Sequence, residues 1–279
     1  MRPVAVLADI HGNLEALDTV LAELKPLNPR AYLVLGDSFG ELGAAVEVYE
    51  RLEALKPVWI MGNREWDMAA VCRGERELWQ DAVQFAPMVK SALALGPVME
   101  EVAQWPMTTS WEGLRLAHGS PEGVREPLFP GTERLDSLLQ TTGENMTVVG
   151  HDHKQWAYRR GGKQLLAVGS VGICHAGRAF RSQYGLLWQK DGYWRGKLCE
   201  TGYDGSRVAV RLKKSGWLED TGLVVRVSYE EIACGYETLH MFIKTAHRIC
   251  MSEYGKILTP LPNWIMEQAA RIYPWKSEL

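Results

Sequence analysis

Five short polar segments, each placed directly after an apolar run, constrain the fold of this chain more than any other feature. The apolar runs, such as Val4–Leu7, Tyr32–Leu35 and Val58–Met61, are typical of buried strands. The segments that follow the runs are Asp9-Ile10-His11, Gly36-Asp37, Gly62-Asn63, Ala117-His118-Gly119 and Gly150-His151-Asp152-His153. Four of the chain's seven histidines lie in these segments. We therefore expect polar side chains to gather where several strands end.

The first half of the chain predicts a parallel sheet. Helical periodicity over Asn13–Lys25 and Gly43–Leu55 separates the first three strands, and a helical pattern resumes from Glu65 to about Leu95. Alternation of strand and helix is typical of right-handed crossovers between parallel strands.

Beyond Gly96 the pattern changes to strands joined by short turns. The expected strands are Leu114–Ala117, Thr147–Val149, Gln155–Arg160, Lys163–Val168, Tyr184–Gln189 and Tyr193–Leu198. A parallel sheet followed by a more antiparallel one predicts an α/β fold with two packed mixed sheets flanked by helices. We expect a first domain over residues 1–210 and a helical C-terminal extension over residues 211–279, in which Tyr229–Tyr254 forms one long helix and Asn263–Ile272 a second.

Charge and composition exclude several classes of partner. The net charge of -3 argues against bulk binding of nucleic acid or a membrane surface. Five widely spaced cysteines form no C-x-x-C pair, which favours free thiols in a reducing compartment. No secretory signal precedes the first strand, and no apolar run approaches the ~18 residues that span a bilayer, so we expect a cytoplasmic protein.

The polar segments offer ligands for metal ions. Ligands bind beyond the carboxyl ends of the strands in an open α/β sheet, and all five segments lie at such ends. The i, i+2 spacing of Asp9 with His11, and of His151 with His153, turns each pair to one side if the strand geometry continues. A carboxylate such as Asp37 can bridge two ions, and Asn63 adds a neutral oxygen. Two ions ~3.5–4 Å apart can clamp the oxygens of a phosphoryl displacement.

At these residues the chain resembles the calcineurin-like metallophosphoesterase superfamily, and most of all its small prokaryotic phosphodiesterase-like branch. The resemblance covers residues 4–200, and the motifs that carry it occur in the family's order. They are Asp9-Ile10-His11-Gly12-Asn13, Gly36-Asp37-Ser38-Phe39-Gly40, Gly62-Asn63-Arg64-Glu65, His118-Gly119-Ser120-Pro121, Gly150-His151-Asp152-His153 and the closing turn Gly169-Ser170-Val171-Gly172.

The resemblance implies a four-layer αββα sandwich and a role for each ligand. Asp9, His11 and His153 are expected to hold the first metal. Asn63, His118 and His151 are expected to hold the second, and Asp37 to bridge the two ions. A hydroxide between the metals would be the nucleophile. The ligands suit manganese, iron, zinc or nickel, and we expect two divalent ions, with manganese active in vitro.

Arg64 departs from the family pattern, in which a histidine often follows the metal-binding Asn. An arginine stays protonated, so it can hold a phosphate oxygen but cannot act as a general acid. This favours substrates whose leaving group needs no protonation. Either Arg64 contacts the phosphate, or it points away and pairs with Glu65 or another acid. Glu65 either orients a histidine or serves as an acid at a helix N-terminus.

The main functional hypothesis is a dimetal phosphoesterase that hydrolyses small-molecule or nucleotide phosphoesters, with phosphodiesters preferred over monoesters. Its catalytic residues would be Asp37, Asn63, Arg64 and His118. The alternative is a binding scaffold that keeps the fold without catalysis, as the retromer scaffold subunit does. His175 and Arg178 either line the substrate pocket or belong to an ordinary loop. The extension either packs on the core, caps the metal cleft or forms a homodimer interface.

Overall fold

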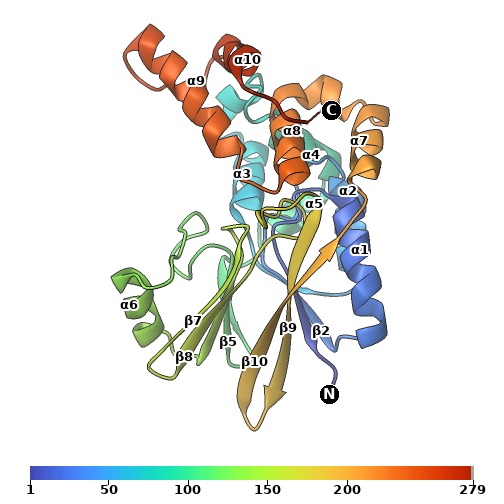
Figure 1. Ribbon diagram of the computed structural model, residues 1–279, viewed down its shortest axis with the longest axis vertical. Coiled ribbons are helices and arrows are strands. Elements are labelled where there is room, and N and C mark those ends of the chain that lie inside the picture. Colours follow the sequence, from blue (N-terminus) through green and yellow to red (C-terminus); the bar gives the residue numbers. More distant parts are fainter. Residues whose placement is uncertain (278–279) are drawn as a thin grey trace.

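Two mixed β-sheets form the centre of the molecule. The computed structural model describes residues 1–277, and within them each sheet contains five strands (Figure 1). In the first sheet β1 pairs with β2 in parallel and with β9 in antiparallel orientation. Its order is β10 (Tyr193–Gly202), β9 (Arg181–Lys190), β1 (Val4–Leu7), β2 (Ala31–Val34) and β3 (Val58–Trp59). The order of the second is β4 (Thr108–Trp111), β5 (Leu114–Ala117), β6 (Met146–Val149), β8 (Lys163–Val168) and β7 (Gln155–Arg160).

Both faces of each sheet are covered, and successive side chains of a strand pack alternately into the two cores on either side of the sheet. In β1, Val4 and Val6 pack between the two sheets, while Ala5 and Leu7 face the helices on the outer side. These helices include α1 (Leu14–Leu24), which is followed by a short 3-10 turn over Lys25–Leu27, and α2 (Ala45–Glu53). Side chains two residues apart share a face of a strand, so each strand contributes to two cores.

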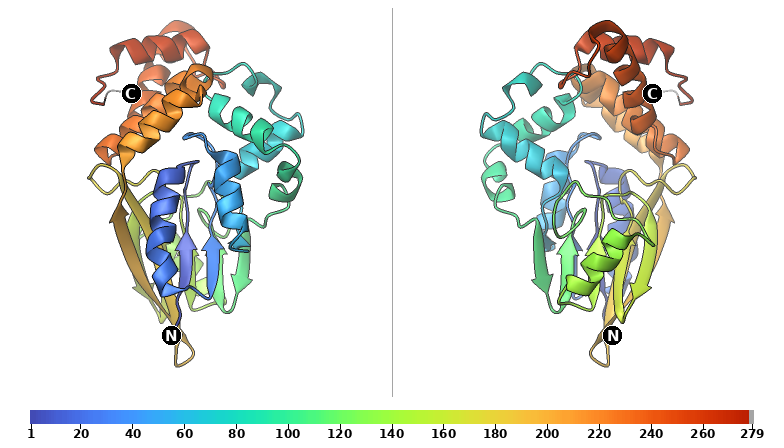
Figure 2. Two further views of the ribbon diagram at one scale, coloured as in Figure 1. Left: turned by 90° about the vertical axis from the view of Figure 1, so that its right-hand side faces the viewer. Right: turned by 90° about the vertical axis from the view of Figure 1, so that its left-hand side faces the viewer.

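The second sheet is covered in the same way by α6 (Glu133–Thr141). Val148 of β6 points into the core between the sheets, whereas Val149 packs with Leu135 and Leu138 of α6. The layers therefore run helix, sheet, sheet, helix, and the expected four-layer αββα sandwich is confirmed (Figure 2).

Shorter helices follow β3 and close the first half of the chain. They are α3 (Asn63–Cys72), a 3-10 turn over Glu77–Trp79, α4 (Ala86–Leu95) and α5 (Val98–Val102). The helical pattern over Glu65–Leu95 is thus two helices with an irregular segment between them. Gly74 has a positive φ of 74° directly after α3, and Pro87 stands in the first turn of α4.

The C-terminal helices lie beyond the carboxyl ends of β1 and β2, at the opposite end of the molecule from the N-terminus (Figure 1). They are α7 (Gly205–Lys214), α8 (Trp217–Cys234), α9 (Leu239–Tyr254) and α10 (Asn263–Ile272). The last three share a core of their own, with Phe242, Ala246 and Ile265 at its centre. The proposed domain boundary after residue 210 falls inside α7, because the helical segment begins at Gly205.

The prediction of one helix over Tyr229–Tyr254 is wrong. Gly235 has a φ of 75° and ends α8, and the chain turns before α9 begins at Leu239. A Cβ on Gly235 would lie 2.3 Å from the carbonyl oxygen of Arg178, so the loop between β8 and β9 packs directly against this break. The turn gives α8 and α9 different directions.

The expected strands at Leu114–Ala117, Gln155–Arg160 and Lys163–Val168 have the observed bounds, whereas β9 and β10 are longer than expected. The sequence interpretation missed β4, α5 and α6. In residues 1–277 no helix combines the length and the hydrophobicity needed to cross a bilayer. The five cysteines are free, and Cys174 and Cys250 are buried.

Candidate metal centre

Five of the seven predicted ligands sit on backbone in the left-handed region. The φ angles are 55° for Asp9, 52° for His11, 50° for Asp37, 73° for His151 and 56° for His153. Side chains with a Cβ rarely adopt this conformation, which costs of order 1–3 kcal/mol at each position. The ligands therefore lie in tight turns after β1, β2 and β6. The i, i+2 pairs converge through these turns and not, as expected, through continued strand geometry.

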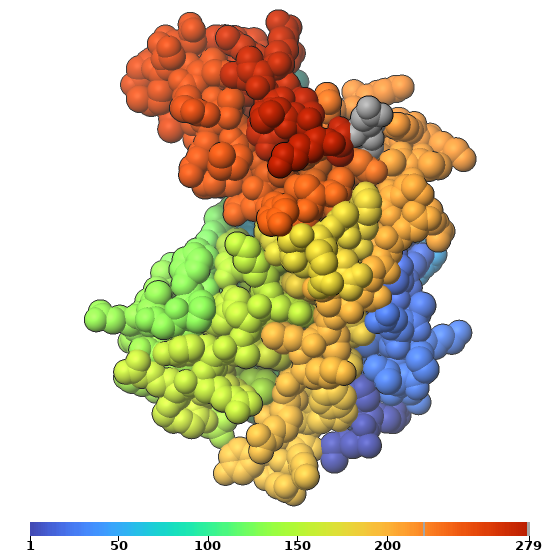
Figure 3. Space-filling model, in the orientation of Figure 1, coloured from blue at the N-terminus to red at the C-terminus, as the bar shows by residue number. Residues whose placement is uncertain are grey.

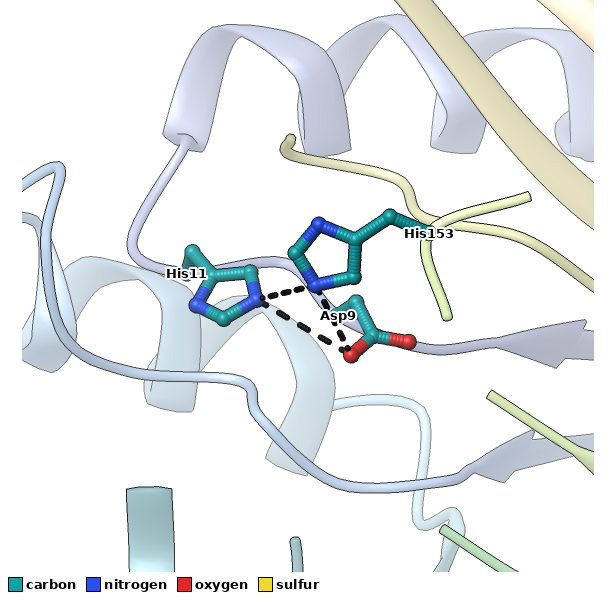
Figure 4. Close-up of side chains that lie close together, drawn as sticks. All are labelled: Asp9, His11 and His153. Carbon is teal, nitrogen blue, oxygen red and sulfur yellow. Dashed lines mark hydrogen bonds and ion pairs between the residues drawn. The ribbon is translucent and has the colours of Figure 1, made fainter. Parts of the chain in front are cut away.

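One cluster joins Asp9, His11 and His153 (Figure 4). The Nε2 atoms of the two histidines lie 3.0 Å apart, and Asp9 Oδ1 lies 3.4 Å from His153 Nε2 and 3.8 Å from His11 Nε2. His11 Nδ1 donates to the Glu41 carboxylate at 2.8 Å, which leaves a lone pair on its Nε2. Asp9 Oδ1 is buried and has no hydrogen-bond partner among the described residues.

A second cluster joins Asp9, Asp37 and His118. His118 Nδ1 donates to the Leu35 carbonyl at 2.7 Å, so its Nε2 faces the cluster. This Nε2 lies 3.5 Å from Asp37 Oδ1, and 3.2 Å from both Asn63 Oδ1 and His151 Nδ1. The structure thus brings all seven predicted ligands to one place at the carboxyl ends of the strands.

Asp37 belongs to the second cluster and also faces the first. Its Oδ1 faces His118, and its Oδ2 lies 4.0 Å from His11 Nε2. One oxygen is therefore directed toward each cluster, as a bridging carboxylate requires. Asp9 Oδ1 also faces both clusters, at 3.9 Å from His118 Nε2.

Close backbone contacts around the ligands require glycine. A Cβ on Gly62 would lie 2.3 Å from the Asp37 nitrogen, and one on Gly172 would lie 1.8 Å from the Ile10 carbonyl oxygen. The Gly172 amide also donates to the Asp9 carbonyl. The turn at Gly169-Ser170-Val171-Gly172 therefore packs against the Asp9 turn, which explains its place among the motifs.

Glu65 holds the Asp37 turn in place. Its carboxylate accepts hydrogen bonds from the backbone N–H groups of Gly62, Asp37 and Ser38, at 2.9, 2.8 and 2.7 Å. Glu65 is fully buried at the start of α3. The interpretation of Glu65 as a helix N-terminal acid matches these contacts, and the same contacts connect α3 to the turn that carries Asp37.

Arg64 pairs with Glu41, an acid that the sequence interpretation did not identify. The Nη2 of Arg64 lies 2.5 Å from Glu41 Oε1, while Glu41 Oε2 accepts from His11. The Arg64 backbone nitrogen donates to Asp37 Oδ1 at 2.7 Å. The side chain is 19 % exposed, so it lies at the edge of the centre. No motif spacing marks Glu41, because its role depends on a loop that folds back toward His11.

The buried charges of the centre strongly shift the pKa values of His118, His151 and Glu41. Burial opposes a charge on His118, yet Asp37 and Asp9 raise its pKa to about 10. Burial and the neighbouring His118 lower the pKa of His151 to about 4. Burial alone would raise the pKa of Glu41, but Arg64 and His11 lower it to about 2. The carboxylates thus form a negative centre that favours cations.

The C-terminal helices contact the turns that carry these residues. Trp217 Nε1 of α8 donates to the Glu41 carbonyl at 2.9 Å, and Arg211 Nη1 of α7 donates to the Leu42 carbonyl at 2.6 Å.

Glu231 of α8 lies 3.4 Å from His175 Nε2, and the His175 ring lies against His153 with centroids 5.0 Å apart. Arg178 instead pairs with Glu200. The extension therefore packs on the core, and His175 is beside the centre.

The donor set fits divalent transition-metal ions. Imidazole nitrogens, carboxylate oxygens and one amide oxygen converge, and the buried Asp9 Oδ1, which accepts no hydrogen bond from the described residues, faces His11, His118 and His153 at 3.8, 3.9 and 3.4 Å. Asp9, His11 and His153 would hold one ion, and Asn63, His118 and His151 a second, with Asp37 between them.

Comparison with known proteins identifies the family of the chain. Residues 2–155 match the model of the calcineurin-like phosphoesterase family, and the chain belongs to this family. It is 25% identical to the uncharacterized protein MJ0912 of Methanocaldococcus jannaschii over 178 residues, which are 60% of this chain and 69% of that protein.

Two solved structures share the fold at low sequence identity. A metallophosphoesterase from Sphaerobacter thermophilus superposes with a TM-score of 0.64 and 18% identity, over 81% of this chain and 99% of that one. The hypothetical protein PH1004 from Pyrococcus horikoshii gives a TM-score of 0.69 and 18% identity, over 84% and 99% of the two chains. At such identities the likeness concerns the fold alone.

Proposed function

We propose that this protein is a dimetal phosphoesterase that prefers phosphodiesters to phosphomonoesters. The observation that carries the proposal is the pair of clusters that share Asp9, with Asp37 of the second cluster also facing the first. When bound, two divalent ions would supply positive charge for the phosphate and a water of lowered pKa as the nucleophile. Manganese, iron, zinc and nickel all suit these ligands.

The residues of the chain have separate roles in this proposal. Glu41 orients His11 by accepting from its Nδ1, and Leu35 orients His118 in the same way. Arg64 is protonated at all working pH values, and Glu41 and Asp37 raise its pKa further despite burial. Its guanidinium can donate to a phosphate oxygen, but it cannot give a proton to a leaving group.

The absence of a general acid at position 64 supports the diester preference. A leaving group that departs as a stable anion, such as an aryloxide, needs no proton. General acid help is worth ~10²–10⁴-fold where it exists, so esters of poor leaving groups are expected to react slowly. We expect aryl or nucleotidyl diesters to be the better substrates.

The test combines metal binding with hydrolysis. The purified protein is titrated with Mn²⁺ by calorimetry and then assayed on bis(p-nitrophenyl) phosphate and p-nitrophenyl phosphate. We expect two ions per chain and a higher kcat/KM for the diester. Asp37→Asn is expected to abolish hydrolysis, and the matched control Asp191→Asn, in the turn between β9 and β10, to keep full activity. Two bound ions with no activity on any ester would favour the binding scaffold.

A further inference from the structure

Two cavities lie beside the metal centre, and one face of α9 borders both. The larger, of about 770 Å³, is lined by His151 and His153 together with the loop before α6 and the start of α9. Phe129, Trp156 and Leu239 contribute apolar surface to it. Figure 3 shows a notch at this level, between the C-terminal helices and the green segment around residue 130.

The smaller cavity, of about 100 Å³, lies against Arg64 and Glu41. Phe85 and Met88 from the start of α4, and Val224 from α8, line it with apolar surface, and Gln84 adds a polar amide. Its volume corresponds to about three water molecules at liquid density, enough for a short alkyl group.

Leu239 and Ile243 line both cavities. They stand four residues apart on α9, so their side chains share one face of the helix. Two kinds of interaction fix the orientation of this face of α9. Glu231 accepts hydrogen bonds from the backbone N–H groups of Thr238 and Leu239 at 2.9 and 3.1 Å, and Phe242 is fully buried in the core of α8, α9 and α10. The two side chains therefore form a fixed partition between the cavities.

We propose that this partition selects phosphodiesters with two unequal substituents: an aromatic group in the larger cavity and a compact alkyl group in the smaller one. The inference rests on the proposed function and deepens it. A phosphodiester carries two organic groups on one phosphorus. The larger cavity reaches the centre at His151 and His153, and the smaller reaches it at Arg64 and at Glu41, whose carboxylate accepts from His11. Hydrolysis joins a water oxygen to phosphorus and breaks one ester bond, and the water's protons pass to the released oxygen and the solvent.

The chemistry of the walls matches the two groups. Aromatic and aliphatic side chains that line the larger cavity offer flat apolar contacts to a ring, while His240 and Lys154 add polar contacts beside the acids Asp152, Glu231 and Glu237. The walls of the smaller cavity, apart from Gln84 and the Arg64–Glu41 pair, are apolar, and its volume suits a compact group better than a second ring. Leu239 and Ile243 are thus specificity-determining residues in a segment outside the family match.

The experiment measures both binding and turnover. Calorimetry compares methyl(phenyl)phosphinate with diphenylphosphinate, which contain no ester bond. Kinetics compare methyl p-nitrophenyl phosphate with bis(p-nitrophenyl) phosphate. The variant Leu239→Ala/Ile243→Ala removes the partition. Met241→Ala is the control, because Met241 lies on the same helix with 55% of its surface exposed.

We expect wild type to bind methyl(phenyl)phosphinate more tightly, and the double variant to shift the ratio of affinities about 10-fold toward diphenylphosphinate. The ratio of kcat/KM values should shift in the same direction, with Met241→Ala unchanged. A shift of less than twofold in the double variant would overturn the partition while leaving the phosphodiesterase intact. If wild type hydrolyses neither diester and binds neither phosphinate, the proposed function fails as well.

A second variant keeps the inference testable if the double variant does not fold. Ile243→Phe adds volume to the partition and narrows both cavities. We expect it to weaken diphenylphosphinate binding more than methyl(phenyl)phosphinate binding. An equal loss for both ligands would contradict the assignment of unequal cavities.

Discussion

The guanidinium of Arg64 lies 2.5 Å from the carboxylate of Glu41, beside the predicted metal centre. The same carboxylate accepts from His11, so one buried acid joins a predicted metal ligand to the arginine. The Arg64 backbone nitrogen donates to Asp37, and its side chain pairs with Glu41, so the expected alternative of a pair with an acid other than Glu65 is the one observed.

Arg64→His should raise monoesterase activity relative to diesterase activity. A neutral or protonated imidazole can exchange a proton with the leaving group, which a guanidinium cannot. The measurement is the ratio of kcat/KM for an alkyl phosphomonoester, whose alkoxide leaving group needs a proton, to that for bis(p-nitrophenyl) phosphate, with Arg64→Lys as a control that keeps the charge. If the ratio in Arg64→His equals that in wild type, residue 64 does not set the choice of leaving group.

Glu41→Gln should lower the free energy of unfolding by about 3 kcal/mol, because it leaves the charge of Arg64 buried without its partner. Urea denaturation of the metal-free protein gives the value. The double variant Glu41→Gln/Arg64→Met should recover part of the loss, since it removes the uncompensated charge. Additive losses in the two single variants would mean that the pair is not coupled.

Glu65→Gln should weaken metal binding about 10- to 100-fold, because an amide oxygen replaces only part of a carboxylate that accepts three backbone hydrogen bonds. Calorimetric titration with Mn²⁺ measures the affinity. Glu47→Gln is the matched control, because Glu47 is an exposed acid in the first turn of α2. Equal affinities in the two variants would show that Glu65 does not position Asp37.

Cys174 should contribute a pH dependence to stability above pH 9. Burial, with a smaller effect from Glu200, raises the pKa of its thiol from 9.0 to about 12. The folded state keeps the proton while the unfolded state loses it, so the stabilisation is complete below pH 9 and is lost as the pH rises toward 12. The unfolding free energy of wild type should fall more steeply than that of Cys174→Ala between pH 9 and 11. Parallel curves would contradict the shift.

Thiol reactivity gives an independent check on the same residue. In the folded protein at pH 8 the exposed Cys72 should react with a disulfide reagent, while the buried Cys174 stays protected. Rapid modification of Cys174 in the native protein would show that its environment opens.

Much of the fold could be predicted because the local sequence pattern is enough to predict most of the strands. The runs Val4–Leu7, Leu114–Ala117 and Lys163–Val168 are short, apolar and bounded by turn residues, so their ends are visible in the sequence. The sequence interpretation missed α6, although Leu135, Leu138 and Leu139 have helical spacing, because this amphipathic stretch is short.

The candidate site could be predicted only in part. Asp9, Asp37 and His118 stand in motifs, and their place at strand ends is enough to predict that they gather. Glu41 lies 30 residues from His11 along the chain, and only the fold shows that the two residues meet. The left-handed turns at the ligands, and the break at Gly235 that sets the direction of α9, depend equally on tertiary contacts that no local pattern encodes.

The cavity walls also bear on how this protein forms during its synthesis. The last predicted metal ligand, His153, leaves the ribosome well before Glu231, Leu239 and Ile243. A growing chain therefore has all its predicted metal ligands before the residues of α8 and α9 that line the larger cavity have been synthesised. Metal capture can precede closure of the cleft, and substrate selection becomes possible only after α9 has emerged and docked.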